Sequence, residues 1–140
     1  MKKQILTLLF VAAAGISSYA QCDKKIILSA SSTEFLNSAN EVQRTDDKTT
    51  IVEYDSKSIM IMPGDDVLQG TVNSITCDWK TPYKEGKTVI KATMSSPGGQ
   101  TMNMTITIEG KDGKNIFMGE FNESPDRKVR LTLEKFEEKK

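Results

Sequence analysis

The sequence predicts an all-β fold, an antiparallel meander of about eight strands closed into a small barrel or sandwich. Beyond residue 24, short apolar alternations are interrupted by turn-forming residues about every ten positions, a spacing typical of strands joined by hairpins. No segment there keeps a 3.6-residue apolar period long enough for a helix. A chain of 140 residues also has the size of one ordinary domain.

The expected strands are separated by segments rich in Gly, Pro, Asp and Ser, which fix or permit the dihedral angles of turns. Clear examples are residues 63–66, 96–99, 110–113 and 124–126. Between Thr101 and Phe136 the alternation predicts a continuous β-meander. The strands expected from this pattern are Lys25–Ala30, Thr49–Tyr54, Ser58–Met62, Leu68–Trp79, Thr88–Met94, Thr101–Glu109, Asn115–Phe121 and Val129–Phe136.

Two further segments have less regular patterns. Ser31 and Glu34 have the spacing of a helix capping box and are followed by Phe35. The stretch up to Asn40 is short and polar, so either a helical turn or a further strand is expected there. At the other end, the mixed charges from Glu134 onward predict a solvated tail after the last strand.

The first twenty residues have the three parts of a secretory signal peptide. Lys2 and Lys3 precede an apolar run over residues 5–16, and a small-x-small ending closes at Ala20. The apolar run is shorter than the roughly 20 helical residues that a bilayer requires. We expect residues 1–20 to be a signal peptide cleaved after Ala20, which leaves residues 21–140 as a single β domain in the periplasm or secreted.

Cys22 and Cys77 are the only cysteines of the chain. Two lone cysteines in a small exported domain usually pair, and this disulfide would tie the mature N-terminus to a central strand. One alternative is lipid attachment at Cys22 with Cys77 free, although Gln21 is not the small residue that a lipobox places before its cysteine. The other is a reactive or metal-binding thiol, but no Cys-x-x-Cys motif and no histidine accompany it.

The composition excludes several kinds of site. The 19 basic residues are balanced by 19 acidic ones, so no basic excess indicates a nucleic-acid partner. The absence of histidine removes His-dependent triads and imidazole metal sites. The sequence also has no Gly-x-Ser-x-Gly motif and no Gly-rich phosphate-binding loop. We therefore expect no catalytic, cofactor-binding or metal-binding residues and no cofactor.

Four methionines occur in two Met-x-Met pairs, Met60 with Met62 and Met102 with Met104. This spacing puts both thioethers of a pair on one face of a strand. Exposed thioether clusters select Cu(I), whereas buried methionines fill irregular gaps in a core. Isoleucines continue the same alternation after Met104, which favours core packing. A Cu(I) site would require the two strands to be neighbours with the methionines facing solvent.

Trp79 and Tyr83 are the candidate ligand contacts, because aromatic side chains beside a loop are common contact residues in binding proteins. Trp79 alternates with Cys77 along one strand face, which favours a position in the core above the disulfide. Tyr83 follows Pro82 in a turn, which favours an exposed contact.

The strand pattern of the whole mature chain resembles that of small exported lipocalin-like β proteins of bacteria. The resemblance implies an antiparallel barrel. The Gly-x-Trp signature of true lipocalins is missing from the first strand, and the only tryptophan is Trp79, so no site residues follow from the resemblance. The function expected is an exported, non-catalytic binding or interaction domain whose partner is a small apolar ligand or another envelope protein. The alternatives are a small carboxylate-dependent envelope enzyme and a Met-rich Cu(I)-binding protein.

Overall fold

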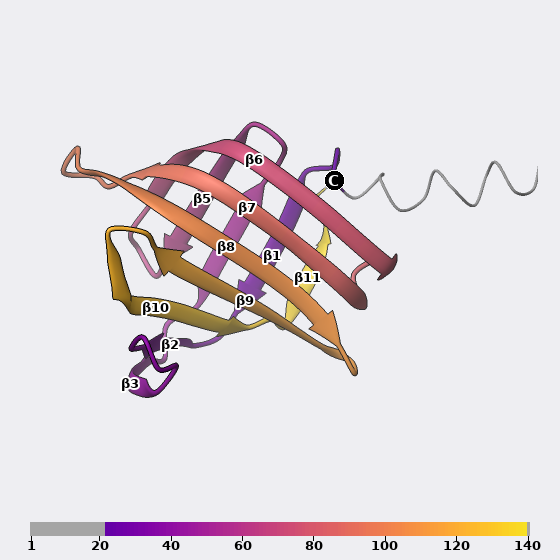
Figure 1. The fold of residues 1–140 in the computed structure, drawn as a ribbon, viewed down its shortest axis with the longest axis horizontal. Coiled ribbons are helices and arrows are strands. Elements are labelled where there is room, and N and C mark those ends of the chain that lie inside the picture. The colour runs from indigo at the N-terminus through magenta and orange to yellow at the C-terminus, as the bar shows by residue number, and fades with distance from the viewer. Residues whose placement is uncertain (1–21, 140) are drawn as a thin grey trace, which may run out of the picture.

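The computed structural model describes residues 22–139, and this part of the chain forms one antiparallel sheet of eleven strands. The spatial order is β11-β1-β4-β5-β6-β7-β8-β9-β10-β2-β3. Neighbours in the sequence are therefore neighbours in the sheet from β4 to β10, as in a meander (Figure 1). The strands are β1 (Ile26–Ala30), β2 (Thr33–Leu36), β3 (Val42–Asp46), β4 (Thr50–Tyr54), β5 (Ser58–Pro63), β6 (Leu68–Thr81), β7 (Glu85–Ser95), β8 (Thr101–Lys111), β9 (Lys114–Phe121), β10 (Ser124–Thr132) and β11 (Lys135–Glu138).

The all-β antiparallel prediction is confirmed, and the first seven expected strands are found with bounds that differ from the predicted ones by three residues or fewer. The sheet is not closed into a barrel, and it has eleven strands instead of eight. The capping-box segment is strand β2 and not a helical turn. Strand β3 was not predicted, because four of its five residues are exposed and it has no apolar alternation.

The predicted last strand is divided in two, and the expected solvated tail is wrong. The tail residues form β11, which pairs with β1 from Ser29↔Lys135 to Ile26↔Glu138. The predicted turn at residues 124–126 instead begins β10, where the pairing with β9 shifts register between Ser124 and Lys128. The charged sequence predicted a tail without secondary structure. The residues nevertheless form a strand, because their backbone groups pair with β1 from the start of the domain.

The core lies on one face of the strongly curved sheet. In Figure 1 the long strands β6 to β9 cross in front of β5, β1 and β11, and side chains from both groups of strands meet in one buried cluster. Alternation builds this face, as in β8, where Met104, Ile106 and Ile108 are buried between more exposed neighbours. Ile26 and Leu28 of β1 and Ile90 of β7 complete the centre of the cluster.

Two chain connections join the opposite outer parts of the sheet, which contain β11 and β1 on one side and β10, β2 and β3 on the other. The first connection leads from β1 to β2, and the second leads from β10 to β11. β1 pairs with β11, and β2 pairs with β10. At these connections, the Glu134 amide donates to the Ser29 carbonyl at 2.8 Å, and Ser31 Oγ donates to Glu134 Oε1 at 2.7 Å. The β2–β3 hairpin projects beside these connections (Figure 1).

The expected disulfide is confirmed. Cys22 is bonded to Cys77, with 5.8 Å between their Cα atoms, and this bond joins the segment before β1 to the long strand β6. Since its sulfur is in the disulfide, Cys22 has no thiol for lipid attachment, and neither cysteine is free to react. A disulfide indicates an oxidising, extracellular type of compartment.

The predicted signal peptide, residues 1–20, lies outside the described residues. Within residues 22–139, no helix has the length and apolar character needed to cross a membrane.

Candidate functional site

An apolar pocket of about 150 Å³ opens at one end of the sheet, where β5 leads to β6 and where β9 ends. Its walls come from strands that are far apart in the sequence, and no polar atom contributes to its accessible lining. The side chains that dominate it are Phe35, Ile61, Leu68, Met104, Phe117 and Phe121.

The deep side of the pocket is built by buried residues on the inner face of the sheet. Met104 and Phe117 are 2% and 1% exposed, and they point inward because the residues that alternate with them face outward. Gly119 lies beside them, and a Cβ at this position would meet Val129 Cγ2 and Met104 Cε. The glycine therefore lets these two side chains approach each other next to the pocket.

Two threonines also line the pocket, and one hydrogen bond joins their side chains. Thr33 Oγ1 and Thr50 Oγ1 are 3.0 Å apart, and both residues are buried. Their hydroxyls do not reach the accessible lining, to which no polar atom contributes. A wall without accessible polar groups holds water poorly, so the pocket favours an apolar occupant.

The mouth of the pocket is formed by half-buried residues. Phe35, Pro63, Leu68 and Phe121 are each partly accessible. The Arg44 guanidinium lies 4.3 Å from the centre of the Phe35 ring, a cation–π distance. This contact places a positive charge from β3 next to an aromatic wall of the pocket.

A shallow depression of about 300 Å³ adjoins the pocket and shares Leu68 and Phe121 with it. Its polar wall contains Glu123 and Arg127 from the β9–β10 region. Both carboxylate oxygens of Glu123 accept hydrogen bonds from the Asn103 amide N–H at 3.1 Å, and Oε1 also accepts one from Asn103 Nδ2 at 2.8 Å. Within residues 22–139 Arg127 forms no ion pair.

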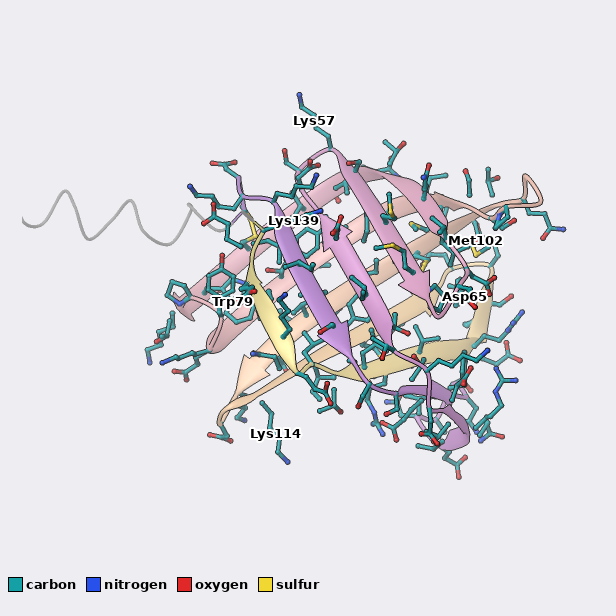
Figure 2. All side chains as sticks on the ribbon, turned by 180° about the vertical axis from the view of Figure 1, so that it is seen from behind. Lys57, Asp65, Trp79, Met102, Lys114 and Lys139 are labelled. Carbon is teal, nitrogen blue, oxygen red and sulfur yellow. A yellow bond between two sulfur atoms is a disulfide. The ribbon has the colours of Figure 1, made fainter. Side chains whose placement is uncertain are left out.

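The candidate contacts from the sequence lie at the other end of the molecule. Figure 2 shows Trp79 and Met102 at opposite ends of the sheet. Trp79 is 3% exposed, with its ring centre 5.4 Å from that of Phe136, so it packs in the core near the disulfide. Tyr83 is half-buried, and its ring packs edge-on against Phe136 at 5.0 Å. The structure therefore brings Trp79 and Tyr83 together through Phe136, away from the apolar pocket.

Burial acts on the titration of two tyrosines at that end. Burial raises the pKa of Tyr54 far above its usual value, and the nearby Tyr83 adds to the shift. Burial also raises the pKa of Tyr83, with a smaller contribution from the Glu138 carboxylate. Both phenols therefore stay neutral at physiological pH, and neither is poised as a base.

The structure separates the two methionine pairs. Ile59 and Ile61 of β5 are buried, so the alternating Met60 and Met62 lie on the outer face, whereas Met104 lies in the core. Strands β6 and β7 lie between β5 and β8, so the pairs are not on neighbouring strands. The condition for a shared thioether site is not met. Among the described residues, no group of three or more His, Cys, Asp or Glu side chains is placed to hold a metal ion.

The buried polar residues of the described part of the chain are Thr33, Thr50 and Thr88. None of them is a carboxylic acid. A pair of facing buried carboxylates, which the enzyme alternative requires, is not found within residues 22–139.

Comparison of the chain with protein-family models, with curated proteins and with solved structures finds no match. The class that the fold and site define is an all-β antiparallel protein with an apolar pocket. Sequence reasoning missed this pocket. Phe35, Leu68 and Phe121 are far apart in the chain, and the only local signal was that one expected strand begins at Leu68 and another ends at Phe121.

Proposed function

We propose that the chain is an exported, non-catalytic binding domain that holds one small apolar group in the apolar pocket. The observation that carries this proposal is the accessible, wholly apolar wall of a pocket beside the core cluster. Its volume of about 150 Å³ is that of an engineered apolar cavity that stays dry and binds benzene. Pockets that enclose drug-sized ligands run from about 300 to 1,000 Å³. One ring or a short alkyl chain therefore fits.

The energetics of such a ligand follow from its size. Burying a chain of about five methylene groups gains about 4 kcal/mol at about 0.8 kcal/mol per group. A gain of about 4 kcal/mol corresponds to a dissociation constant of about 1 mM, before the cost of association is subtracted. The apolar group by itself thus binds weakly, and a tighter ligand needs further contacts outside the pocket.

The disulfide and the signal-peptide pattern of residues 1–20 support export to the periplasm or beyond the cell. The lipocalin-like resemblance concerns the strand pattern alone and assigns no binding residues.

The test is a titration of the mature domain with 1-hexanol, followed by NMR of methionine methyl groups labelled with ¹³C. The Met104 methyl lines the pocket and is expected to shift, whereas Met60 lies on the outer face and is expected to stay unchanged. Shifts of equal size at both methyls, or none at Met104, would overturn the proposal.

A pair of matched variants separates binding in the pocket from adsorption to the surface. Val129→Phe enlarges a half-buried side chain of the pocket wall and should abolish the Met104 shift. Val89→Phe makes the same change at a half-buried residue on the outer face of β7 and should leave the titration unchanged. Thermal unfolding of both variants establishes that they fold, and a milder Val129→Leu variant serves if Val129→Phe does not.

A further inference from the structure

The shallow depression beside the pocket has one negative and one positive wall residue, Glu123 and Arg127. The Glu123 carboxylate keeps its charge, but its oxygens are turned toward Asn103, from which they accept three hydrogen bonds. Arg127 is exposed, and within residues 22–139 it has no ion-pair partner. The acidic residues Asp65 and Asp66 are in the loop before Leu68 but do not line the depression.

The depression and the pocket are adjacent, because Leu68 and Phe121 line both. A molecule with its apolar end in the pocket would have to pass these two side chains to reach Arg127. Other donors line the depression, namely the Gln100 amide and the Thr101 and Ser124 hydroxyls. The lining therefore changes from wholly apolar in the pocket to polar in the depression, where Arg127 and these donors lie with Glu123.

We propose that the ligand of the apolar pocket is a small amphiphile with an oxyanion head group, whose tail fills the pocket and whose head pairs with Arg127. This inference rests on the proposed function. The planar guanidinium presents two parallel N–H donors, which match the oxygens of a carboxylate or a phosphate. The Arg44 guanidinium on Phe35 adds a second positive charge near the mouth. The head group supplies the contacts that the short tail lacks.

The experiment compares three ligands that share one tail: hexanoate, hexyl phosphate and 1-hexanol. Dissociation constants for the mature domain are measured from the Met104 methyl shift at low and at high ionic strength. We expect hexanoate or hexyl phosphate to bind at least about fivefold more tightly than 1-hexanol, as expected for a charge-assisted hydrogen bond that is partly screened. The advantage should shrink with added salt, and the tighter of the two anions identifies the head group.

Arg127→Gln removes the charge and keeps a polar, shorter side chain. It should bring both anions to within about twofold of 1-hexanol while leaving 1-hexanol itself unchanged, since the neutral ligand makes no charge-assisted contact. The matched control is Lys57→Gln, which removes one exposed positive charge in the β4–β5 turn, far from Met102 in Figure 2. This control should leave all three affinities unchanged.

The outcomes separate the two proposals. If none of the three ligands shifts the Met104 methyl, the pocket does not bind apolar groups and both proposals fail. If 1-hexanol binds as tightly as the anions, or if Arg127→Gln leaves the anions' advantage intact, the head-group inference fails while the proposed function stands.

Discussion

The indole Nε1 of Trp79 donates a 2.6 Å hydrogen bond to Oγ1 of Thr88, across the paired strands β6 and β7. The same hydroxyl lies 3.6 Å from Cys77 Sγ, so one threonine links the only indole of the chain to its disulfide. Trp79 is 3% exposed and Thr88 is 0% exposed. A buried indole N–H requires such a partner, because solvent does not replace it.

Thr88→Val is expected to destabilise the protein by about 1–3 kcal/mol, because it leaves the buried Trp79 N–H without an acceptor while keeping the size of the side chain. Urea unfolding, followed by Trp79 fluorescence, measures the change in the free energy of unfolding. Thr88→Ser retains the hydroxyl and is the control. A Thr88→Val protein as stable as Thr88→Ser would show that the hydrogen bond contributes nothing.

Loss of the disulfide is expected to lower the free energy of unfolding by up to about 4 kcal/mol, the chain-entropy value for a loop of this size. The two cysteines are 55 positions apart, so the bond constrains a large part of the unfolded chain. The measurement is thermal unfolding of the oxidised protein against Cys22→Ser/Cys77→Ser. Alkylation of the native protein before reduction should label no thiol, and two labelled thiols would contradict the disulfide.

Gly110→Ala is expected to destabilise the protein by about 1–3 kcal/mol through overpacking. A Cβ at Gly110 would meet the Asn115 side chain, the Lys84 carbonyl and the Trp79 ring. Gly98→Ala is the matched control, since its Cβ would find only Ser96 Oγ at 3.9 Å. Denaturant unfolding of the two variants gives both values. Equal stabilities would contradict the close packing of the Trp79 ring on β8.

The ion pair between Glu34 and Arg130 should make stability depend on pH. Arg130 Nε lies 2.9 Å from Glu34 Oε1, and the hydrogen bond from Arg130 lowers the pKa of Glu34 below its usual value. A lowered carboxyl pKa stabilises the folded state above the unfolded value of about 4.3, and this stabilisation is lost as the pH falls through the folded pKa. Both side chains are partly exposed, so the pair contributes at most about 1 kcal/mol.

Arg130→Gln is therefore expected to be less stable than the wild type by up to about 1 kcal/mol at neutral pH, and this difference should disappear as the pH falls through the lowered pKa of Glu34. Urea unfolding across this range measures the difference. Lys135→Gln, which removes an exposed pair with Glu137 at 3.4 Å, should change little at any pH. A deficit of Arg130→Gln that persists in acid would assign the effect to lost packing of the arginine stem.

Much of the inner face could be predicted from the sequence. The alternation of Met104 with Ile106 and Ile108 indicated a buried stripe, and all three residues are buried. Trp79 was expected in the core above Cys77, and it lies there. These predictions succeed because side chains alternate between the two faces of a strand, so the faces follow from local sequence once the strand is recognised.

The edge strands could not be predicted in the same way. The exposed β3 and the charged β11 carry no apolar alternation. Each is held by pairing with a neighbour, β2 or β1, and β11 also by the packing of Phe136 against Trp79 and Tyr83. Pairing uses backbone groups that every residue has, so polar sequence does not prevent it.

The sequence by itself determined the antiparallel β class, the turns near residues 63–66, 96–99 and 110–113, the inward stripe and the pairing of its two cysteines. Only the tertiary structure decided that the sheet has eleven strands and stays open, that Met60 and Met104 face opposite sides, and that a pocket lies between Phe35 and Phe121. Alternation and turn chemistry are properties of neighbouring residues. A pocket is the volume left where side chains from distant strands fail to meet, and its size depends on how those strands are paired and curved.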